Sequence, residues 1–408
     1  LRKLTKINIQ MIIGEIIVTD NIKKSYFQQK DLIDRLSKKN NKFYYINCYN
    51  LFNKKNFVNY KSCKNKKIIF YNPKSIKELD NFLSKNQIFL INNVSPKLYY
   101  LKIHLLLNKK NIFQVSFDNL GTLGSYYVDN WKNVNLNRKI YFLYTKRFAF
   151  FIYRLLIIFG FIKTIDILYL ARKDAFQKYS LSFFRKLPFH KRYKRIISTK
   201  PRHINFNKKR QSEEFITYID MNFNHGDISN ESGRSSKKIN KNAKKIFLKD
   251  LKNYLFYLEQ KLKKKVVLCL HPTSNKLKYQ KIFKEFKVVK YKTDTYLLKS
   301  YLVIFHESSI INHAILIKKK IIQLLTKNLG SYFYAKTKIF SKNFNFVTHD
   351  LEKPQPPINK SFINQLNLKV RNQQKSLNKL YFLNKGTKSV YDLITYEINL
   401  LRKNKINL

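Results

Sequence analysis

Short apolar runs alternate with amphipathic stretches along most of the chain, and this alternation restricts the fold more than any other feature of the sequence. Short apolar runs suit strands that are buried on both faces of a sheet, and amphipathic stretches suit the helices that cover those faces. In the first half we expect strands at 11–18, 42–47, 67–72, 88–93, 112–116 and 166–171. The expected fold class is α/β, with parallel strands joined by crossover helices.

The same alternation restarts after a stretch that is dense in lysine and arginine. We expect a long helix at 239–263 and further helices near 276–286 and 309–318. The expected strands of this second half are 215–221, 265–270, 288–292, 301–305 and 320–326. Pro354, Pro356 and Pro357 then end the alternation, and two C-terminal helices are expected beyond them.

The length of 408 residues suits two hydrophobic cores rather than one. We therefore expect two Rossmann-like domains that face a cleft, at residues 1–185 and 213–352. A basic linker, 186–212, would join them, and a helical extension, 353–408, would follow. Ligands of such sheets are expected at the carboxyl ends of the strands.

The chain carries 82 lysine and arginine residues against 24 aspartate and glutamate residues, a formal net charge of +58. Clustered basic residues are typical of nucleic-acid-binding proteins, because they release counterions from phosphate. A/T-rich codons also explain this composition, since they favour Lys, Asn, Ile, Phe and Tyr. No recognition motif supports a specific nucleic acid, so we expect attraction to polyanions and peripheral contact with the anionic inner face of a membrane.

Cysteine usage indicates a reducing compartment. Cys48, Cys63 and Cys269 are odd in number and lack CxxC spacing, which argues against a disulfide framework and a thiolate metal site. Residues 1–20 lack the uninterrupted apolar run and the cleavage site of a signal peptide. We expect a cytoplasmic protein with neither a metal ion nor another cofactor.

The most apolar segment is 148–162, whose large side chains recur at helical spacing. It is too short to span a membrane, and Arg154 and Lys163 interrupt or border it. A core helix under the first sheet is the favoured interpretation. The alternative is a helix that lies in a membrane interface with its apolar face down.

Two short motifs follow two of the expected strands. The strand 265–270 delivers His271 and Pro272 to its carboxyl end, where proline ends the ladder of hydrogen bonds. As an imidazolium, His271 would hydrogen-bond a phosphate oxygen and stabilise the charge that grows on a departing nucleotide. A ligand site at this strand end is therefore predicted.

The second motif follows the strand 301–305 and comprises His306, Glu307, Ser308 and Ser309, with an amphipathic helix directly after it. Hydroxyls and free backbone N–H groups at a helix N-terminus favour a phosphate group. A serine in this place is equally suited to cap the helix. Both roles stay open for Ser308 and Ser309.

Together, His271-Pro272 and Ser308-Ser309 resemble the HP and SS motifs of bacterial sialyltransferases and polysialyltransferases, which are GT-B-type glycosyltransferases of surface-polysaccharide synthesis. The stretch 310–325 is also similar to CDP-glycerol glycerophosphotransferases and capsule-synthesis transferases. The resemblance implies a nucleotide-sugar donor, with a CMP-linked nonulosonate expected, and a glycan or lipid-linked glycan acceptor. It also implies an inverting transfer without a metal ion.

The resemblance implies roles for the motif residues. His271, in the HP motif that Pro272 completes, would contact the donor phosphate and protonate the leaving group. Ser308 and Ser309 would bind the nucleotide phosphate, and Glu307 stands where a carboxylate would hold a ribose hydroxyl.

Two aspartates complete the candidate set. An inverting transferase needs a carboxylate to deprotonate the acceptor hydroxyl, and Asp118, at the end of the strand 112–116, is our candidate base. Its surroundings, Asp-Asn-Leu-Gly, depart from the paired acids of the sialyltransferases and also suit an ordinary turn. Asp220 ends the strand 215–221 and is a candidate donor-binding residue, although capping a turn is its simpler role.

Two other classes of function remain open. A basic nucleic-acid- or polyanion-binding protein would use the abundant Tyr and Phe to stack on bases. A non-catalytic binder built on a transferase fold would bind the donor without turning it over.

Overall fold

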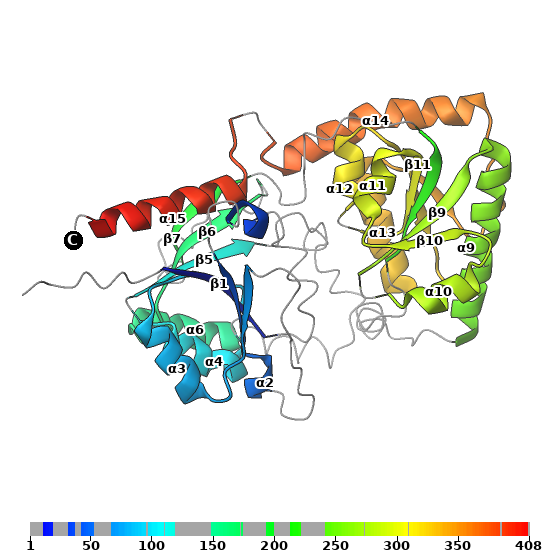
Figure 1. Cartoon of the computed structure of the whole chain (residues 1–408). Coiled ribbons are helices and arrows are strands. Elements are labelled where there is room, and N and C mark those ends of the chain that lie inside the picture. The colour runs from blue at the N-terminus through cyan, green and yellow to red at the C-terminus, as the bar shows by residue number, and fades with distance from the viewer. Residues whose placement is uncertain are drawn as a thin grey trace, which may run out of the picture. The chain divides into compact units, whose positions relative to one another are not determined.

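The computed structural model describes most of the chain. The described residues are 11–18, 32–36, 42–52, 67–94, 97–109, 111–118, 148–171, 173, 193–199, 213–221, 241–272, 274–308, 310–383 and 386–406. These residues form two α/β units, whose elements are labelled in Figure 1.

The first unit is built on a seven-stranded sheet in the order β3-β2-β1-β4-β5-β6-β7, with every neighbouring pair parallel. Its strands are β1 (Ile12–Ile17), β2 (Phe43–Asn47), β3 (Ile68–Tyr71), β4 (Ile88–Ile91), β5 (Ile112–Asp118), β6 (Ile165–Leu170) and β7 (Tyr193–Ser198). Its helices are α2 (Tyr49–Phe52), α3 (Ile76–Lys85), η1 (Leu98–Tyr100), α4 (Leu101–Leu106), α6 (Ala149–Ile158) and α15 (Val390–Ile406).

The second unit is built on a six-stranded parallel sheet in the order β10-β9-β8-β11-β12-β13. Its strands are β8 (Phe215–Ile219), β9 (Lys265–Leu270), β10 (Lys287–Lys290), β11 (Ser300–Phe305), β12 (Lys320–Leu325) and β13 (Val347–Asp350). Its helices are α9 (Lys241–Leu262), α10 (Lys276–Ile282), α11 (Thr293–Leu298), α12 (Ile311–Leu316), α13 (Ser331–Phe344) and α14 (Lys360–Leu380).

In both sheets the first strand along the chain is central. The second and third strands lie on one side of it, and the fourth and later strands lie on the other side. Numbered within each unit, the strand order is 3-2-1-4-5-6, with a seventh strand added in the first unit. This is the order of the Rossmann fold. The predicted α/β class with two Rossmann-like domains is thereby confirmed, and each expected strand is present within two residues at its ends.

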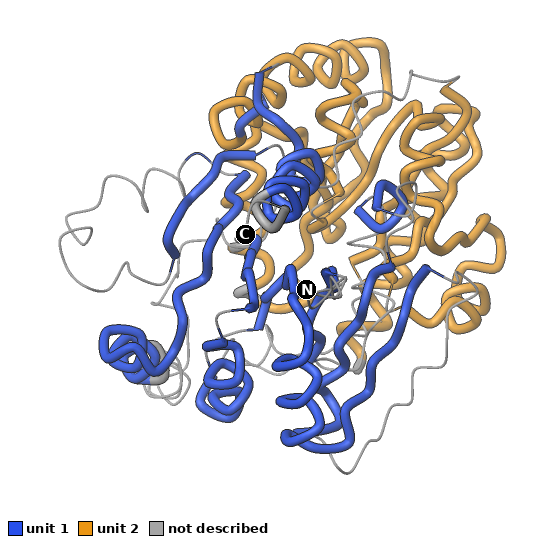
Figure 2. The backbone as a smooth tube through the Cα atoms, turned by 60° about the vertical axis from the view of Figure 1, so that its left-hand side comes forward, with its two compact units in different colours: residues 1–120, 141–202, 382–408 blue, residues 121–140, 203–381 orange. Residues whose placement is uncertain are grey.

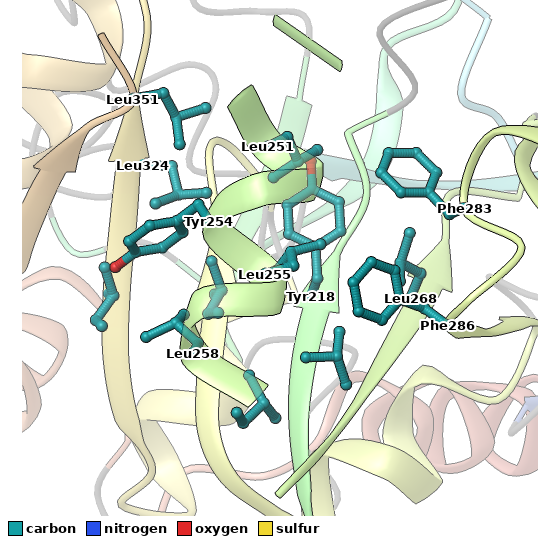
Figure 3. Close-up of a cluster of buried hydrophobic side chains, with 14 of the residues drawn as sticks. Tyr218, Leu251, Tyr254, Leu255, Leu258, Leu268, Phe283, Phe286, Leu324 and Leu351 are labelled. Carbon is teal, nitrogen blue, oxygen red and sulfur yellow. The ribbon is translucent and has the colours of Figure 1, made fainter. Parts of the chain in front are cut away.

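The core of the second unit lies between its sheet and one face of α9. Leu251, Leu255 and Leu258 are fully buried on this face, as their spacing in the sequence predicts. Figure 3 shows them against Tyr218 of β8 and Leu268 of β9. Helix α9 and the six-stranded sheet thus share one apolar core.

Strand β7 lies within the stretch 186–212 that we expected to be a linker, and it is the seventh strand of the first sheet. Its sequence is strongly basic because it lies at a sheet edge, where charged side chains are tolerated. Lys194 pairs with the buried Asp166, at 2.8 Å, and Arg195 pairs with Glu397 of α15, at 3.1 Å. Because Lys194 and Arg195 interrupt its apolar residues, this strand could not be recognised from the hydrophobic pattern of the sequence.

The two predicted C-terminal helices are present, and they belong to different units (Figure 2). Helix α14 packs on the second unit, where Leu366 and Leu377 are buried. Helix α15 packs on the first unit through Ile394 and Ile398. The chain re-enters the first unit where the N–H of Phe382 donates to the carbonyl of Ala171 at 3.1 Å.

Candidate active site

The candidate site lies at the carboxyl ends of the central strands of the second sheet. Strands β8 and β11 are neighbours there, and the strand order changes direction between them. Sheets of this order bind ligands outside the carboxyl ends of the strands at this point. Asp220 follows β8, His271 follows the adjacent β9, and His306 begins the loop after β11. The two motifs found in the sequence therefore lie on the same edge, on either side of Asp220.

The carboxylate of Asp220 is buried beneath the loop that carries His271, with 2% of the residue exposed. Its Oδ2 accepts hydrogen bonds from the backbone N–H of His271, at 3.2 Å, and from the hydroxyl of Ser274, at 2.5 Å. Its Oδ1 accepts a hydrogen bond from the hydroxyl of Tyr279 in α10, at 2.7 Å. Asp220 thus ties three points of the loop and the following helix to the end of β8.

This arrangement sets the protonation of Tyr279. Burial and the adjacent Asp220 carboxylate raise the pKa of Tyr279 above its ordinary value. The phenol therefore stays protonated and donates to Asp220. The carboxylate is directed at protein groups, so its position suits a residue that holds the loop rather than one that contacts a ligand.

The loop itself presents His271 and Pro272 at the edge of the sheet. His271 is half-buried and Pro272 is exposed. Residues at the end of β10 add a second support, because Lys290 Nζ donates to the carbonyl of Ser274, at 2.9 Å, and Tyr291 Oη donates to the carbonyl of Pro272, at 3.2 Å. A histidine and a lysine are thus brought to one loop.

The motif after β11 divides into a buried and an accessible part. Glu307 and Ser308 are half-buried, whereas His306 is fully buried among the rings of Tyr218, Phe247 and Phe333. Desolvation lowers the pKa of His306 to about 3, so its imidazole is neutral. His306 therefore belongs to the core, and Glu307 and Ser308 are the members of this motif that can face a ligand.

Helix α12 begins without a serine cap. The residue at the N-cap position is Ile310, which makes no side-chain capping bond, and the carbonyl of Ser308 accepts from the N–H of Ile311 at 3.3 Å. Ser308 thus contributes its backbone carbonyl to the start of this helix. Ser309 lies outside the described residues.

The burial of His306 predicts a pH dependence of stability. The unfolded chain binds a proton at His306 below pH 6.5, its ordinary pKa, whereas the folded chain does so only near its lowered pKa of about 3. Acidification through this window therefore favours the unfolded state. Between pH 6.5 and pH 5 the loss is about 2 kcal/mol. Urea denaturation at both pH values should show this loss, and His306→Phe should abolish it; equal losses in the two proteins would contradict the assignment.

On the same edge, the loop between β12 and α13 binds the side-chain carboxylate of Glu352. Glu352 accepts hydrogen bonds from the backbone N–H of Lys327, at 3.1 Å, and from the hydroxyl of Thr326. An incoming phosphate would have to displace this carboxylate.

The first unit carries the candidate base. Asp118 is the last residue of β5, and its backbone pairs with Leu170 of β6 at the carboxyl edge of the sheet. The rest of the turn that contains it lies outside the described residues. A second acid of this unit, Glu15 in β1, is 5% exposed and accepts from Asn93 Nδ2 at 3.1 Å.

Other groups that carry chemistry give no competing centre. Within the described residues, no cluster of three or more His, Cys, Asp or Glu side chains could hold a metal ion. Cys48 and Cys269 are buried free thiols, and burial raises the pKa of each to about 12. Neither is therefore a reactive thiolate near neutral pH.

Sequence reasoning missed the residues that support the loop. Ser274, Tyr279, Lys290 and Tyr291 all contact it or its anchor, Asp220. The chain contains 82 lysine and arginine residues and 28 tyrosines, so these residue types stand out nowhere in the sequence. Only the strand order brings β8, β9 and β10 side by side and makes their roles visible.

No known protein family matches the chain, and no curated protein matches it in sequence. Similar solved structures include CalG4, the calicheamicin glycosyltransferase, at 8% identity over 90% of this chain and 95% of that chain, with a TM-score of 0.46. MurG of Acinetobacter baumannii is 8% identical over 97% of this chain and 99% of its own, with a TM-score of 0.45. The wall teichoic acid polymerase TagF is 13% identical over 98% of this chain and 90% of its own, with a TM-score of 0.49. The fold of this chain is defined by the strand orders of its two sheets.

Proposed function

We propose that this chain is an inverting, metal-independent glycosyltransferase of surface-polysaccharide synthesis. The observation that carries the proposal is the loop of His271 and Pro272, which Asp220 anchors at the switch point of a Rossmann-like sheet beside Glu307 and Ser308. A histidine on a fixed loop at this place suits the phosphate of a nucleotide donor.

In the proposed reaction, the acceptor hydroxyl oxygen bonds to the anomeric carbon of the donor sugar. The bond between that carbon and the phosphate oxygen breaks, and its electron pair leaves with the nucleotide. Asp118 takes the proton of the acceptor hydroxyl, and His271 stabilises or protonates the departing phosphate. Ser308 and Ser309 bind that phosphate, and Glu307 holds a ribose hydroxyl.

The proposed donor is a CMP-linked nonulosonate, and the proposed acceptor is a glycan or lipid-linked glycan. This choice rests on the HP and SS motifs of the sequence. The proposed location is the reducing cytoplasm, where such donors are consumed. In this scheme Asp220 is a positioning residue that acts through the loop of His271.

The proposal is tested by following nucleotide release from CMP-, UDP- and GDP-sugars in the presence of EDTA. We expect release from one nucleotide class, undiminished by the chelator, because the proposed scheme assigns no step to a metal ion. Release that disappears with EDTA would overturn metal independence. Specific nucleotide binding without any release would favour the non-catalytic binder.

A polyanion-binding function is the second candidate, and the net charge of +58 is the observation that favours it. Such binding weakens steeply with salt because it depends on counterion release. Micromolar affinity for RNA or DNA that persists at physiological salt would support this function. Binding that is lost at physiological salt would remove it.

A further inference from the structure

Exposed apolar side chains are concentrated on one part of the first unit. The described residues include 14 large apolar side chains that are exposed, and eight of them come from two short segments around α4 and α6. We call these eight the aromatic face: Leu98, Tyr99, Leu105, Phe148, Phe151, Ile158, Phe159 and Phe161. Single exposed apolar residues are normal, but a concentration of this kind marks an interaction site.

The two segments lie against each other. Tyr153 Oη of α6 donates to the carbonyl of Lys97 at 2.9 Å, and its ring meets that of His104 of α4 edge-on at 5.0 Å. At the other end, Asn108 Nδ2 donates to the carbonyl of Gly160 at 3.1 Å. Figure 1 shows α4 and α6 side by side on one face of the first sheet. The eight side chains therefore come from two segments that pack against each other.

Helix α6 is held by one side and leaves its other side exposed. Within the helix, Tyr153 is buried and Phe151 is 48% exposed; just beyond its end, Phe159 is 69% exposed and Ile162 is buried. The expectation of a core helix is therefore only half correct. The described part of the first unit therefore leaves one side of this largely apolar helix exposed.

The segments that carry this face are basic. The segments 97–109 and 148–163 contain no aspartate or glutamate, and they contain five lysine or arginine residues. Two of the five, Lys109 and Lys163, pair with Asp80 and Asp166 of neighbouring elements. Lys97 and Lys102 are exposed, and Lys97 Nζ lies 5.3 Å from the centre of the Tyr99 ring. Aromatic side chains flanked by cations are the pattern of a surface that enters the headgroup region of an anionic bilayer.

We propose that the aromatic face docks the chain onto the surface of an anionic membrane. The phenylalanine side chains enter the interface between headgroups and acyl chains, and Lys97 and Lys102 meet lipid phosphates. Contact is peripheral, because no helix of the described part of the chain is long and apolar enough to cross a bilayer. This docking does not depend on the proposed glycosyltransferase activity.

The test is flotation of the full chain with vesicles of phosphatidylcholine alone and of phosphatidylcholine with phosphatidylglycerol. The variant Phe151→Ser/Phe159→Ser/Phe161→Ser removes apolar area and leaves the charge unchanged. The control, Leu277→Ser/Leu368→Ser, removes side chains that are 73% and 74% exposed on the second unit. All five positions are exposed, so circular dichroism and melting temperature should match those of the wild type.

We expect the wild type to bind the anionic vesicles, the triple variant to lose at least about tenfold in partition coefficient, and the control to change by less than about twofold. Equal binding by the triple variant would mean that charge alone holds the chain, which overturns the proposal. The proposal also fails if light scattering shows a wild-type dimer that the triple variant loses while vesicle binding is unchanged, because a second copy would then cover this face.

Discussion

Replacing His271 with alanine is expected to lower the turnover of the nucleotide-sugar donor by about 100-fold or more. The reason is that the imidazole supplies the charge stabilisation of the leaving phosphate in the proposed reaction. The side chain is only half-buried, and Asp220 holds the loop through the backbone N–H of His271. The melting temperature should therefore stay within about 2 °C of the wild-type value. Steady-state kinetics and calorimetry measure the two quantities.

Tyr291→Phe is the matched control for His271→Ala. It removes a hydroxyl that donates to the carbonyl of Pro272 in the same loop, at an exposed position. We expect a change in turnover of less than about fivefold, because exposed hydrogen bonds contribute little. Similar losses in both variants would indicate that the loop, and not the imidazole, matters.

Replacing Asp220 with alanine is expected to lower the free energy of unfolding by about 3 kcal/mol. The substitution leaves the backbone N–H of His271 and the hydroxyls of Ser274 and Tyr279 without their common acceptor. Two of these donors belong to side chains that are almost fully buried, where unmet hydrogen bonds cost most. Equilibrium denaturation in urea measures the loss.

A double-mutant cycle with Tyr279→Phe separates anchoring from simple cavity formation. Tyr279→Phe alone should cost about 1 kcal/mol, because it removes one donor and keeps the ring. In the Asp220→Ala background the same change should cost nearly nothing or become favourable, since the acceptor is already absent. Additive losses would show that the two groups do not act together, contrary to the geometry.

The sequence pattern predicted the strands that are apolar and missed those that are not. Strands such as β9 and β12 are nearly continuous apolar runs, because parallel strands are buried on both faces. Strand β7 carries Lys194 and Arg195, whose partners, Asp166 and Glu397, are distant in the sequence. Strand β13 has only four residues and includes two polar side chains and a charged one. Edge strands of this kind carry too little apolar signal to be recognised alone.

The candidate site divides in the same way. His271 and Ser308 could be placed from the sequence because each follows a recognisable strand, and parallel strands bring their carboxyl ends to one edge. The role of Asp220 could not, since its partners lie 51 to 59 residues away along the chain. The burial of His306 was also hidden, because its three aromatic neighbours come from β8, α9 and α13. Contacts of this kind exist only after the sheet has assembled.

The central claim is that the edge beside β8, β9 and β11 binds a nucleotide through His271. Thermal-shift measurements of the wild type and His271→Ala against CMP, CDP, UDP, GDP and ADP at fixed salt test it directly, because ligands that bind the folded state raise its melting temperature. We predict a shift for one nucleotide, CMP in the proposed scheme, that disappears in the variant. Equal small shifts for all five nucleotides, unchanged by the substitution, would contradict the claim and would mean that the net charge alone attracts phosphate.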